Sequence, residues 1–355
     1  MIWFDFVTPK SVLFFKPMID EIKARGRQLL ITARSSEGYE EITDLLDLYD
    51  IDYINRGGFG GSQLSDKLKA SIDRQLSLIE FVSAYNINRL VCLCSVDANR
   101  VAFGLGIPII NFYDIPLSDF STNFMKALPQ ARLTLPLSSK AFKPFVVPDE
   151  IFTRFSLEPH QVREYNFIDP YIWLKDFVPD LEYAKQVLAP YHLDFSKPLI
   201  VVREEEYKAS YVDKHYSLLY DALEDIHQLT QANIVIIPRY ESSYLVDLFP
   251  FATVLQEKII IQHLLAFTDL FIGGGGTMNT EACLLGVPTI STRSFICHYD
   301  KFQIDSKLMV WVSNRDDLLA AVQTMFSHRI DDIAKQVIAR MDLDIKHLVD
   351  EILSG

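Results

Sequence analysis

The chain has 355 residues, of which 49% are hydrophobic, and carries 34 Lys and Arg against 47 Asp and Glu, for a formal net charge of −13. This length exceeds what one hydrophobic core usually organises, and the acidic balance argues against a nucleic-acid duplex as partner, because duplex binding needs clustered Lys and Arg. Since no apolar run reaches the roughly 20 residues of a membrane-spanning helix and no signal-peptide pattern opens the chain, we expect a cytoplasmic protein of two domains.

Short apolar runs alternate with longer amphipathic stretches in the first half of the chain. Strands are predicted at residues 2–7, 28–32, 90–94 and 108–112, and helices at 11–25, 39–48, 64–85 and 99–105. A Gly-rich loop at 56–61 precedes the third helix. This alternation is typical of βαβ units and a parallel sheet.

A second alternating series follows after a segment with no clear period. Strands are predicted at 198–202, 234–237, 270–272 and 287–290, and helices at about 211–229, 264–268 and 279–285. Residues 165–179 carry two prolines among aromatic residues, which is typical of a hinge. A last helix is predicted at 330–353, packing back on the first half.

The predicted fold class is therefore α/β, with two Rossmann-type doubly wound parallel-sheet domains. We place the first domain at residues 1–168, the hinge at 169–180 and the second domain at 181–329. A helical return segment occupies 330–355. Ligands of such sheets bind at the carboxyl ends of the strands.

Four consecutive glycines, residues 273–276, are the strongest chemical signal. An apolar strand runs into them and a helix follows, whose free N–H groups and dipole favour phosphate. Thr277 stands where a hydroxyl can cap that helix or contact a phosphate. Glu281, one turn further on, is placed to accept hydrogen bonds from ribose hydroxyls. The alternative is a Gly-rich turn with an ordinary surface Glu. No Gly-Lys-Ser/Thr follows, so the segment is not a Walker loop.

The residues assigned to this phosphate site are Gly274, Gly275, Gly276, Thr277, Met278 and Glu281. Arg203 and Arg239 follow predicted strands of the second half and should emerge at the same carboxyl edge. There a guanidinium can form paired, charged hydrogen bonds with a diphosphate. Surface ion pairs with neighbouring Glu residues are the alternative for both.

Asp97 and Asp114 follow the predicted strands that end at Cys94 and Phe112. A carboxylate at a strand end acts as a general base when burial raises its pKa. Asp97 has a second interpretation, as the cap of a helix that begins near residue 99. Both interpretations stay open at the level of sequence.

Cys92 and Cys94 alternate on an apolar strand, so their side chains share one face. A structural zinc site would need a second ligand pair with suitable spacing, which the sequence lacks, and buried reduced thiols are the better interpretation. His, Asp and Glu do not gather at metal-ligand spacing elsewhere. We therefore predict a metal-independent site that requires no cofactor.

Several segments together resemble one protein family over nearly the whole chain. They are Ile2-Trp3-Phe4-Asp5, Phe14-Phe15-Lys16-Pro17, Leu30-Ile31-Thr32-Ala33-Arg34, Arg100-Val101-Ala102-Phe103-Gly104-Leu105-Gly106-Ile107-Pro108, Ile237-Pro238-Arg239-Tyr240, and the glycine segment with Glu281-Ala282. In this order they resemble the archaeal and bacterial family catalogued as domain of unknown function 354 (DUF354). The glycine segment is similar to the second domain of the GT-B glycosyltransferase fold, which the UDP-N-acetylglucosamine 2-epimerases share.

This resemblance implies a cleft between two domains and a UDP-sugar-like donor, which the enzyme transfers or epimerises. The stretch from Cys94 to Asp114 resembles the epimerases, whose acidic residues in these loops transfer protons, so Asp97 and Asp114 are the implied catalytic residues. In the GT-B arrangement the loop after Ile290 faces the sugar, which makes His298 an implied sugar contact, with an ordinary loop histidine as the alternative.

The first loop departs from the family's pattern. Similar chains often carry a His there, whereas this loop contains Lys10 and Ser11. A non-catalytic nucleotide-sugar-binding subunit therefore stays an alternative to a glycosyltransferase and to an epimerase. The acceptor is a sugar, a small molecule or a lipid-linked compound. One further alternative is peripheral contact with a membrane, which the aromatic residues Phe59, Phe120 and Phe124 indicate. Formation of a homodimer is also left open.

Overall fold

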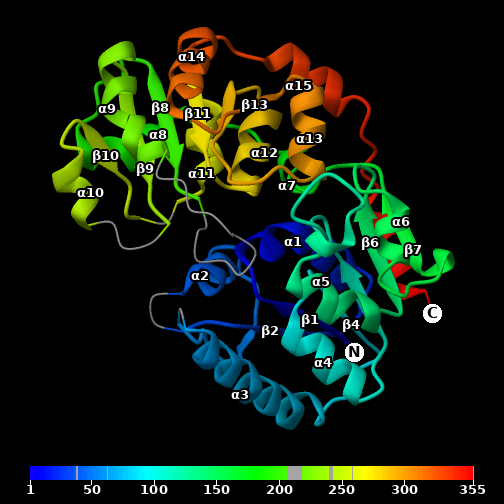
Figure 1. Ribbon diagram of the computed structural model, residues 1–355. Coiled ribbons are helices and arrows are strands. Elements are labelled where there is room, and N and C mark those ends of the chain that lie inside the picture. Colours follow the sequence, from blue (N-terminus) through cyan, green and yellow to red (C-terminus); the bar gives the residue numbers. More distant parts are fainter. Residues whose placement is uncertain (37–38, 62, 206–217, 240–242, 258, 355) are drawn as a thin grey trace. The chain divides into compact units, whose positions relative to one another are not determined.

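The computed structural model describes residues 1–36, 39–61, 63–205, 218–239, 243–257 and 259–354 (Figure 1). The chain forms two compact units. The first contains Met1–Trp173 and Asp342–Gly355, and the second contains Leu174–Met341. The division after Trp173 falls inside the segment predicted as a hinge. Each unit is built on a parallel sheet flanked by helices, so the predicted fold class is confirmed.

The first sheet has seven parallel strands in the order β3-β2-β1-β4-β5-β6-β7. Their bounds are β1 (Ile2–Phe6), β2 (Leu29–Ala33), β3 (Ile54–Asn55), β4 (Arg89–Cys92), β5 (Ile109–Phe112), β6 (Lys140–Pro144) and β7 (Val162–Tyr165). The chain runs outward from β1 to β3, then returns to β4 on the other side of β1. Such a reversal of strand order marks the edge where doubly wound sheets bind ligands.

Helices connect these strands. Their bounds are α1 (Pro9–Ala24), α2 (Glu41–Leu48), α3 (Leu64–Val82), α4 (Val96–Gly104), α5 (Pro129–Thr134), α6 (Asp149–Thr153) and α7 (Tyr171–Leu174). Aromatic side chains fill the space between α1 and the sheet, where Phe14 and Phe15 lie within 5.4 Å of the ring of Phe112, centroid to centroid. The apolar face of α1 thus fixes the start of that helix above the strand ends.

The first turn of α1 differs from the prediction of a loop there. The helix begins at Pro9 because Thr8 caps it and Pro9 occupies its first position, where proline needs no N–H partner. The Thr8 hydroxyl accepts a hydrogen bond from the Ser11 backbone N–H at 3.3 Å. Lys10 and Ser11 therefore lie in the helix, and the buried Ser11 hydroxyl donates to the Thr8 carbonyl at 2.5 Å.

The second sheet has six parallel strands in the order β10-β9-β8-β11-β12-β13. They are β8 (Leu199–Arg203), β9 (Asn233–Ile237), β10 (Ala252–Val254), β11 (Leu270–Gly273), β12 (Thr289–Ser291) and β13 (Met309–Trp311). The helices are α8 (Leu181–Leu188), α9 (Leu218–Thr230), α10 (Ser243–Leu248), α11 (Ile261–Ala266), α12 (Gly276–Leu284), α13 (His298–Asp305), α14 (Arg315–Met325) and α15 (Asp331–Ile338). The predicted start of α9 near residue 211 lies outside the described residues.

The predicted C-terminal helix is two helices. The first, α15, belongs to the second unit, and only α16 (Ile345–Leu353) returns to the first. The break occurs because Asp344 starts a new helix, where its carboxylate accepts a hydrogen bond from the His347 N–H at 2.9 Å. The return therefore begins at Asp342 instead of residue 330, while the packing of the last helix on the first unit is confirmed by the ion pair of Arg25 with Asp350.

Within the part of the chain that the structure describes, none of the helices combines the length and the apolar character needed to cross a bilayer.

Candidate functional site

Three charged side chains meet at the carboxyl edge of the first sheet. Lys10 follows β1, Asp114 follows β5 and Asp169 follows β7. The Lys10 ammonium forms an ion pair with Asp114 and a second one with Asp169 at 2.6 Å. The Tyr165 hydroxyl donates to the other carboxylate oxygen of Asp169 at 2.7 Å. Asp169 is fully buried, whereas the side chains of Lys10 and Asp114 remain 15% and 10% exposed.

Burial sets the acid-base properties of this cluster. It raises the pKa of the Asp114 carboxyl above its ordinary value, with Lys10 opposing the rise and Asp169 adding to it. Burial alone would lower the pKa of Lys10, but the two carboxylates hold it above its ordinary value. A partly accessible carboxyl with a raised pKa is suited to general base catalysis. Sequence reasoning missed Asp169, because it lies in the segment that was interpreted as a hinge.

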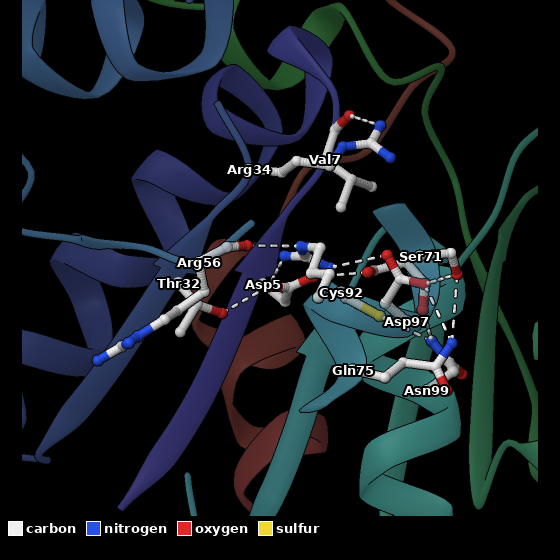
Figure 2. Close-up of polar contacts among 12 residues, drawn as sticks. Asp5, Val7, Thr32, Arg34, Arg56, Ser71, Gln75, Cys92, Asp97 and Asn99 are labelled. Atoms are coloured by element: carbon white, nitrogen blue, oxygen red, sulfur yellow. Dashed lines mark hydrogen bonds and ion pairs between the residues drawn. The ribbon is translucent and has the colours of Figure 1, made fainter. Parts of the chain in front are cut away.

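Asp97 lies in a different environment (Figure 2). It is the second residue of α4, whose cap position is occupied by Ser95, so the prediction that Asp97 caps a helix starting near residue 99 is wrong. One Asp97 oxygen accepts from the Ser71 hydroxyl, and the other lies 3.4 Å from an N–H of Arg74. The donors to Asp97 come from α3, and the Asp97 carboxylate is buried.

Arg74 connects Asp97 to a second buried carboxylate, that of Asp5. The guanidinium is fully buried and donates to Asp5 at 2.6 Å and to the Arg56 carbonyl at 2.8 Å. Asp5 also accepts from the Ser95 hydroxyl at 2.5 Å. One buried cation is thus shared by two buried anions, which satisfies charges that would otherwise be costly in the interior.

The Gly-rich turn of the second unit leads from β11 into α12. Gly275 occupies the cap position of this helix without a side-chain hydrogen bond, and the first turn contains no acidic residue. Thr277 is the second residue inside the helix, which begins at Gly276, so the interpretation of Thr277 as the helix cap is wrong. Its contact with a phosphate stays a prediction. The side chain of Met278 is partly buried and packs against the apolar core.

The four glycines have different roles. A Cβ on Gly273 would collide with the Asn279 amide, and one on Gly274 would lie 2.5 to 2.9 Å from Glu205. A Cβ on Gly276 would lie 3.0 Å from the Arg293 guanidinium. Only Gly275 borders open space, with nothing within 4 Å. Close internal packing thus explains the first two glycines, and the surface available to a ligand is at Gly275.

Arg293 and Glu205 flank this turn, although sequence reasoning missed both. Arg293 follows β12, is 5% exposed, and forms an ion pair with Asp300 at 2.9 Å. The Glu205 carboxylate accepts from the N–H and hydroxyl of Ser294, at 2.9 and 2.7 Å. The signal for Arg293 was available, because it too follows an apolar strand of the second sheet.

The remaining predicted residues of the second unit lie around these elements. Arg203 ends β8 and donates to the carbonyls of Ile237 and Pro238, which ties two strand ends together. Arg239 follows β9 and is partly buried. Glu281 is 2% exposed and accepts a hydrogen bond from Gln262 at 2.6 Å, so its carboxylate faces the interior.

His298 begins α13, because Cys297 and Asp300 form the start of that helix, so the alternative of an ordinary loop histidine is wrong. Its contact with a sugar stays a prediction. All four cysteines are free thiols and are buried. Within the described ranges, no three His, Cys, Asp or Glu side chains gather as a potential metal site.

The fold defined by these two units is GT-B, as the likeness to solved structures shows. One is the UDP-GlcNAc 2-epimerase of Methanocaldococcus jannaschii in complex with UDP-GlcNAc and UDP, with a TM-score of 0.69, 13% identity, and coverage of 95% of this chain and 98% of that one. Another is the spinosyn rhamnosyltransferase SpnG complexed with thymidine diphosphate, with a TM-score of 0.63, 14% identity and coverage of 99% of both chains.

The chain belongs to the family described as protein of unknown function (DUF354), which it matches over residues 1–354. A relative is the uncharacterized protein MJ0665 of Methanocaldococcus jannaschii. The two sequences are 27% identical over 340 residues, which cover 93% of this chain and 92% of the relative.

Replacing Arg74 should test the buried charge network. We expect Arg74→Met to lower the free energy of unfolding by about 3–5 kcal/mol, because it leaves two carboxylates buried without their cation. Urea denaturation measures this change. The control is Lys69→Met on the exposed side of the same helix, which should change stability by less than about 1 kcal/mol. Equal losses in both variants would contradict a structural role for Arg74.

Alanine substitutions at Gly274 and Gly275 should distinguish a glycine that packing requires from a glycine that borders open space. Gly274→Ala should destabilise the protein by about 1–3 kcal/mol, because its Cβ overlaps the backbone of Glu205. Gly275→Ala should cost less than about 1 kcal/mol, since its backbone is extended and its surroundings are open. Thermal unfolding of the two variants compares them directly, and a reversed order of stability would contradict the packing described for Gly274.

Proposed function

We propose that the protein is a nucleotide-sugar-dependent enzyme, a glycosyltransferase of the GT-B type, and that α12 binds the diphosphate of a UDP-sugar-like donor. The observation that carries this proposal is the start of α12. It combines an uncapped helix end, open space at Gly275 and the buried guanidinium of Arg293 beside Gly276. Free backbone N–H groups and a neighbouring cation stabilise a diphosphate without a metal ion. Fold relatives solved with UDP or thymidine diphosphate support this assignment.

Transfer requires a base for the acceptor hydroxyl, and Asp114 is our candidate. As the hydroxyl oxygen forms its bond to the anomeric carbon, its proton passes to Asp114, and the bond from that carbon to the diphosphate oxygen breaks. The leaving nucleoside diphosphate keeps the bonding electrons, and its added charge is stabilised by α12 and Arg293. Asp97 is less suited to this role, because Ser71, Arg74 and Gln75 already donate to it.

Epimerisation is the second candidate, and the Lys10–Asp114 pair favours it. The pair offers a proton donor beside a proton acceptor, whereas a transferase needs only the acceptor. Epimerisation at the carbon next to the anomeric centre breaks and reforms a C–H bond. In deuterated water an epimerase would place deuterium at that carbon of UDP-GlcNAc without any acceptor, and a transferase would not. Three expectations stay predictions: the class of the acceptor, contact with a membrane surface, and formation of a homodimer.

A charge at the cap position of α12 should separate nucleotide binding from stability. We expect Gly275→Asp to keep or slightly raise the melting temperature, because Asp is a better cap than Gly. It should weaken UDP binding at least tenfold, because the carboxylate repels the diphosphate. Gly275→Asn is the matched control, since it adds similar bulk and no charge. Calorimetry that gave the two variants the same UDP affinity would exclude this helix end as the diphosphate site.

Asp114→Asn should separate catalysis from binding. Turnover should fall by roughly a hundredfold, because Asn cannot accept the proton, while UDP affinity stays unchanged. The wild-type rate should decline as the pH falls through the pKa of Asp114, which burial places above the ordinary Asp value of about 3.9. Rate measurements from acidic to neutral pH show whether Asn removes this decline. Full turnover by the variant would exclude Asp114 as the base, and UDP binding without turnover of any donor would favour a non-catalytic subunit.

A further inference from the structure

Arg34 stands at the carboxyl edge of the first sheet, directly after β2. Its guanidinium lies 4.0 Å from the centre of the Phe59 ring. Phe59 in turn stacks on Tyr39, with ring centres 4.4 Å apart and planes inclined by 10°. One guanidinium N–H donates to the Val7 carbonyl at 3.3 Å, which places the group beside the segment between β1 and α1 (Figure 2).

The hydrogen bonds of Arg34 are few for a partly buried guanidinium. An Arg side chain has five N–H donors, and its Nε is buried here without a hydrogen-bond partner. Among the residues described by the structure, no carboxylate lies within ion-pair distance of Arg34. The nearby carboxylates of Asp5 and Asp97 both pair with Arg74 instead.

The electrostatic environment agrees with this geometry. Burial and, to a smaller extent, the positive charge of Arg74 lower the pKa of Arg34 to about 10, because Asp97 and Asp5 only partly oppose these effects. Two guanidinium groups therefore lie close together, and the available carboxylates pair with only one of them. An anion brought to Arg34 would relieve that repulsion and supply acceptors for its N–H groups.

A purely structural role explains these observations less well. The contact with Phe59 and the bond to Val7 would hold the side chain in place, but together they use only one of its five N–H donors. Arg is preferred where a carboxylate or phosphate is bound through two parallel hydrogen bonds. The position also fits a ligand site, because β2 and β1 are neighbours and Lys10 follows β1 at the same edge.

We propose that Arg34 binds an anionic group, a carboxylate or a phosphate, on the acceptor substrate. This proposal rests on the proposed function, because it names the class of acceptor that the base Asp114 would deprotonate. Arg34 would orient the acceptor from β2, while Lys10 and Asp114 act from the ends of β1 and β5. The aromatic pair of Phe59 and Tyr39 holds the guanidinium in a fixed plane, which reduces the entropy lost when a ligand binds.

Calorimetry at constant ionic strength tests this assignment. Inorganic phosphate and glucuronate are titrated separately into protein saturated with UDP, so that the site at α12 is occupied. We expect wild-type protein to bind at least one of them, and Arg34→Gln to weaken that binding at least tenfold. Arg100→Gln, an exposed arginine on α4, is the matched control and should bind like the wild type. The anion that binds identifies the group as phosphate or carboxylate.

A second variant keeps the test decisive if Arg34→Gln fails to fold. Arg34→Lys retains the charge but lacks the planar pair of donors, so it should bind the anion more weakly than wild type. The same titration is repeated with Gly275→Asp protein in the absence of UDP. It measures anion binding at Arg34 even if the protein binds no nucleotide. Failure of this proposal can therefore be distinguished from failure of the proposed function. Equal anion affinity of wild type and Arg34→Lys, or no binding of either anion by wild type, would overturn it.

Discussion

The buried ion pair between Arg74 and Asp5 determines how the carboxyl edge of the first sheet is arranged. It joins the middle of α3 to the central strand β1, so a helix and a strand far apart in the sequence are held in one position. Because a buried charge is tolerated only with its partner, neither group can move independently. The same guanidinium also pairs with Asp97, so this carboxylate shares its cation with Asp5.

Two charged clusters therefore occupy one edge of a single sheet, with different chemical properties. In the cluster of Arg74, two anions share one cation and accept hydrogen bonds from further donors. These contacts favour a fixed position for both carboxylates. In the cluster of Lys10, two anions also share one cation, and burial raises the pKa of Asp114. The two carboxylates are almost equally exposed, with 7% of the Asp97 side chain and 10% of the Asp114 side chain accessible. Acid-base chemistry is assigned to Asp114 because its pKa is raised, whereas three side chains of α3 donate to Asp97.

The glycine turn of the second unit illustrates a similar division of roles. Gly273 and Gly274 lack side chains because Asn279 and Glu205 fill the adjacent space. Gly275 has no such neighbour, and it is the residue whose backbone faces open space. A run of identical residues thus serves both the packing of a strand end and, under the proposed function, the approach of a diphosphate to a helix end.

Local patterns in the sequence determined the fold class. Apolar strands alternating with amphipathic helices predicted parallel sheets, since this periodicity depends on neighbours along the chain. The same patterns identified the glycine turn and placed Asp114 and Arg203 at strand ends. They predicted one C-terminal helix where there are two, because the helix break depends on a single capping carboxylate at Asp344.

Only the tertiary structure decided which of the polar residues act together. Asp97 and Asp114 look equivalent in the sequence, each following an apolar strand, yet α3 supplies donors to the first and Lys10 pairs with the second. Asp169 and Arg293 could not be connected to their partners by spacing alone, since those contacts join separate elements. Burial, charge pairing and access arise from segments distant in the chain, so no local pattern encodes them.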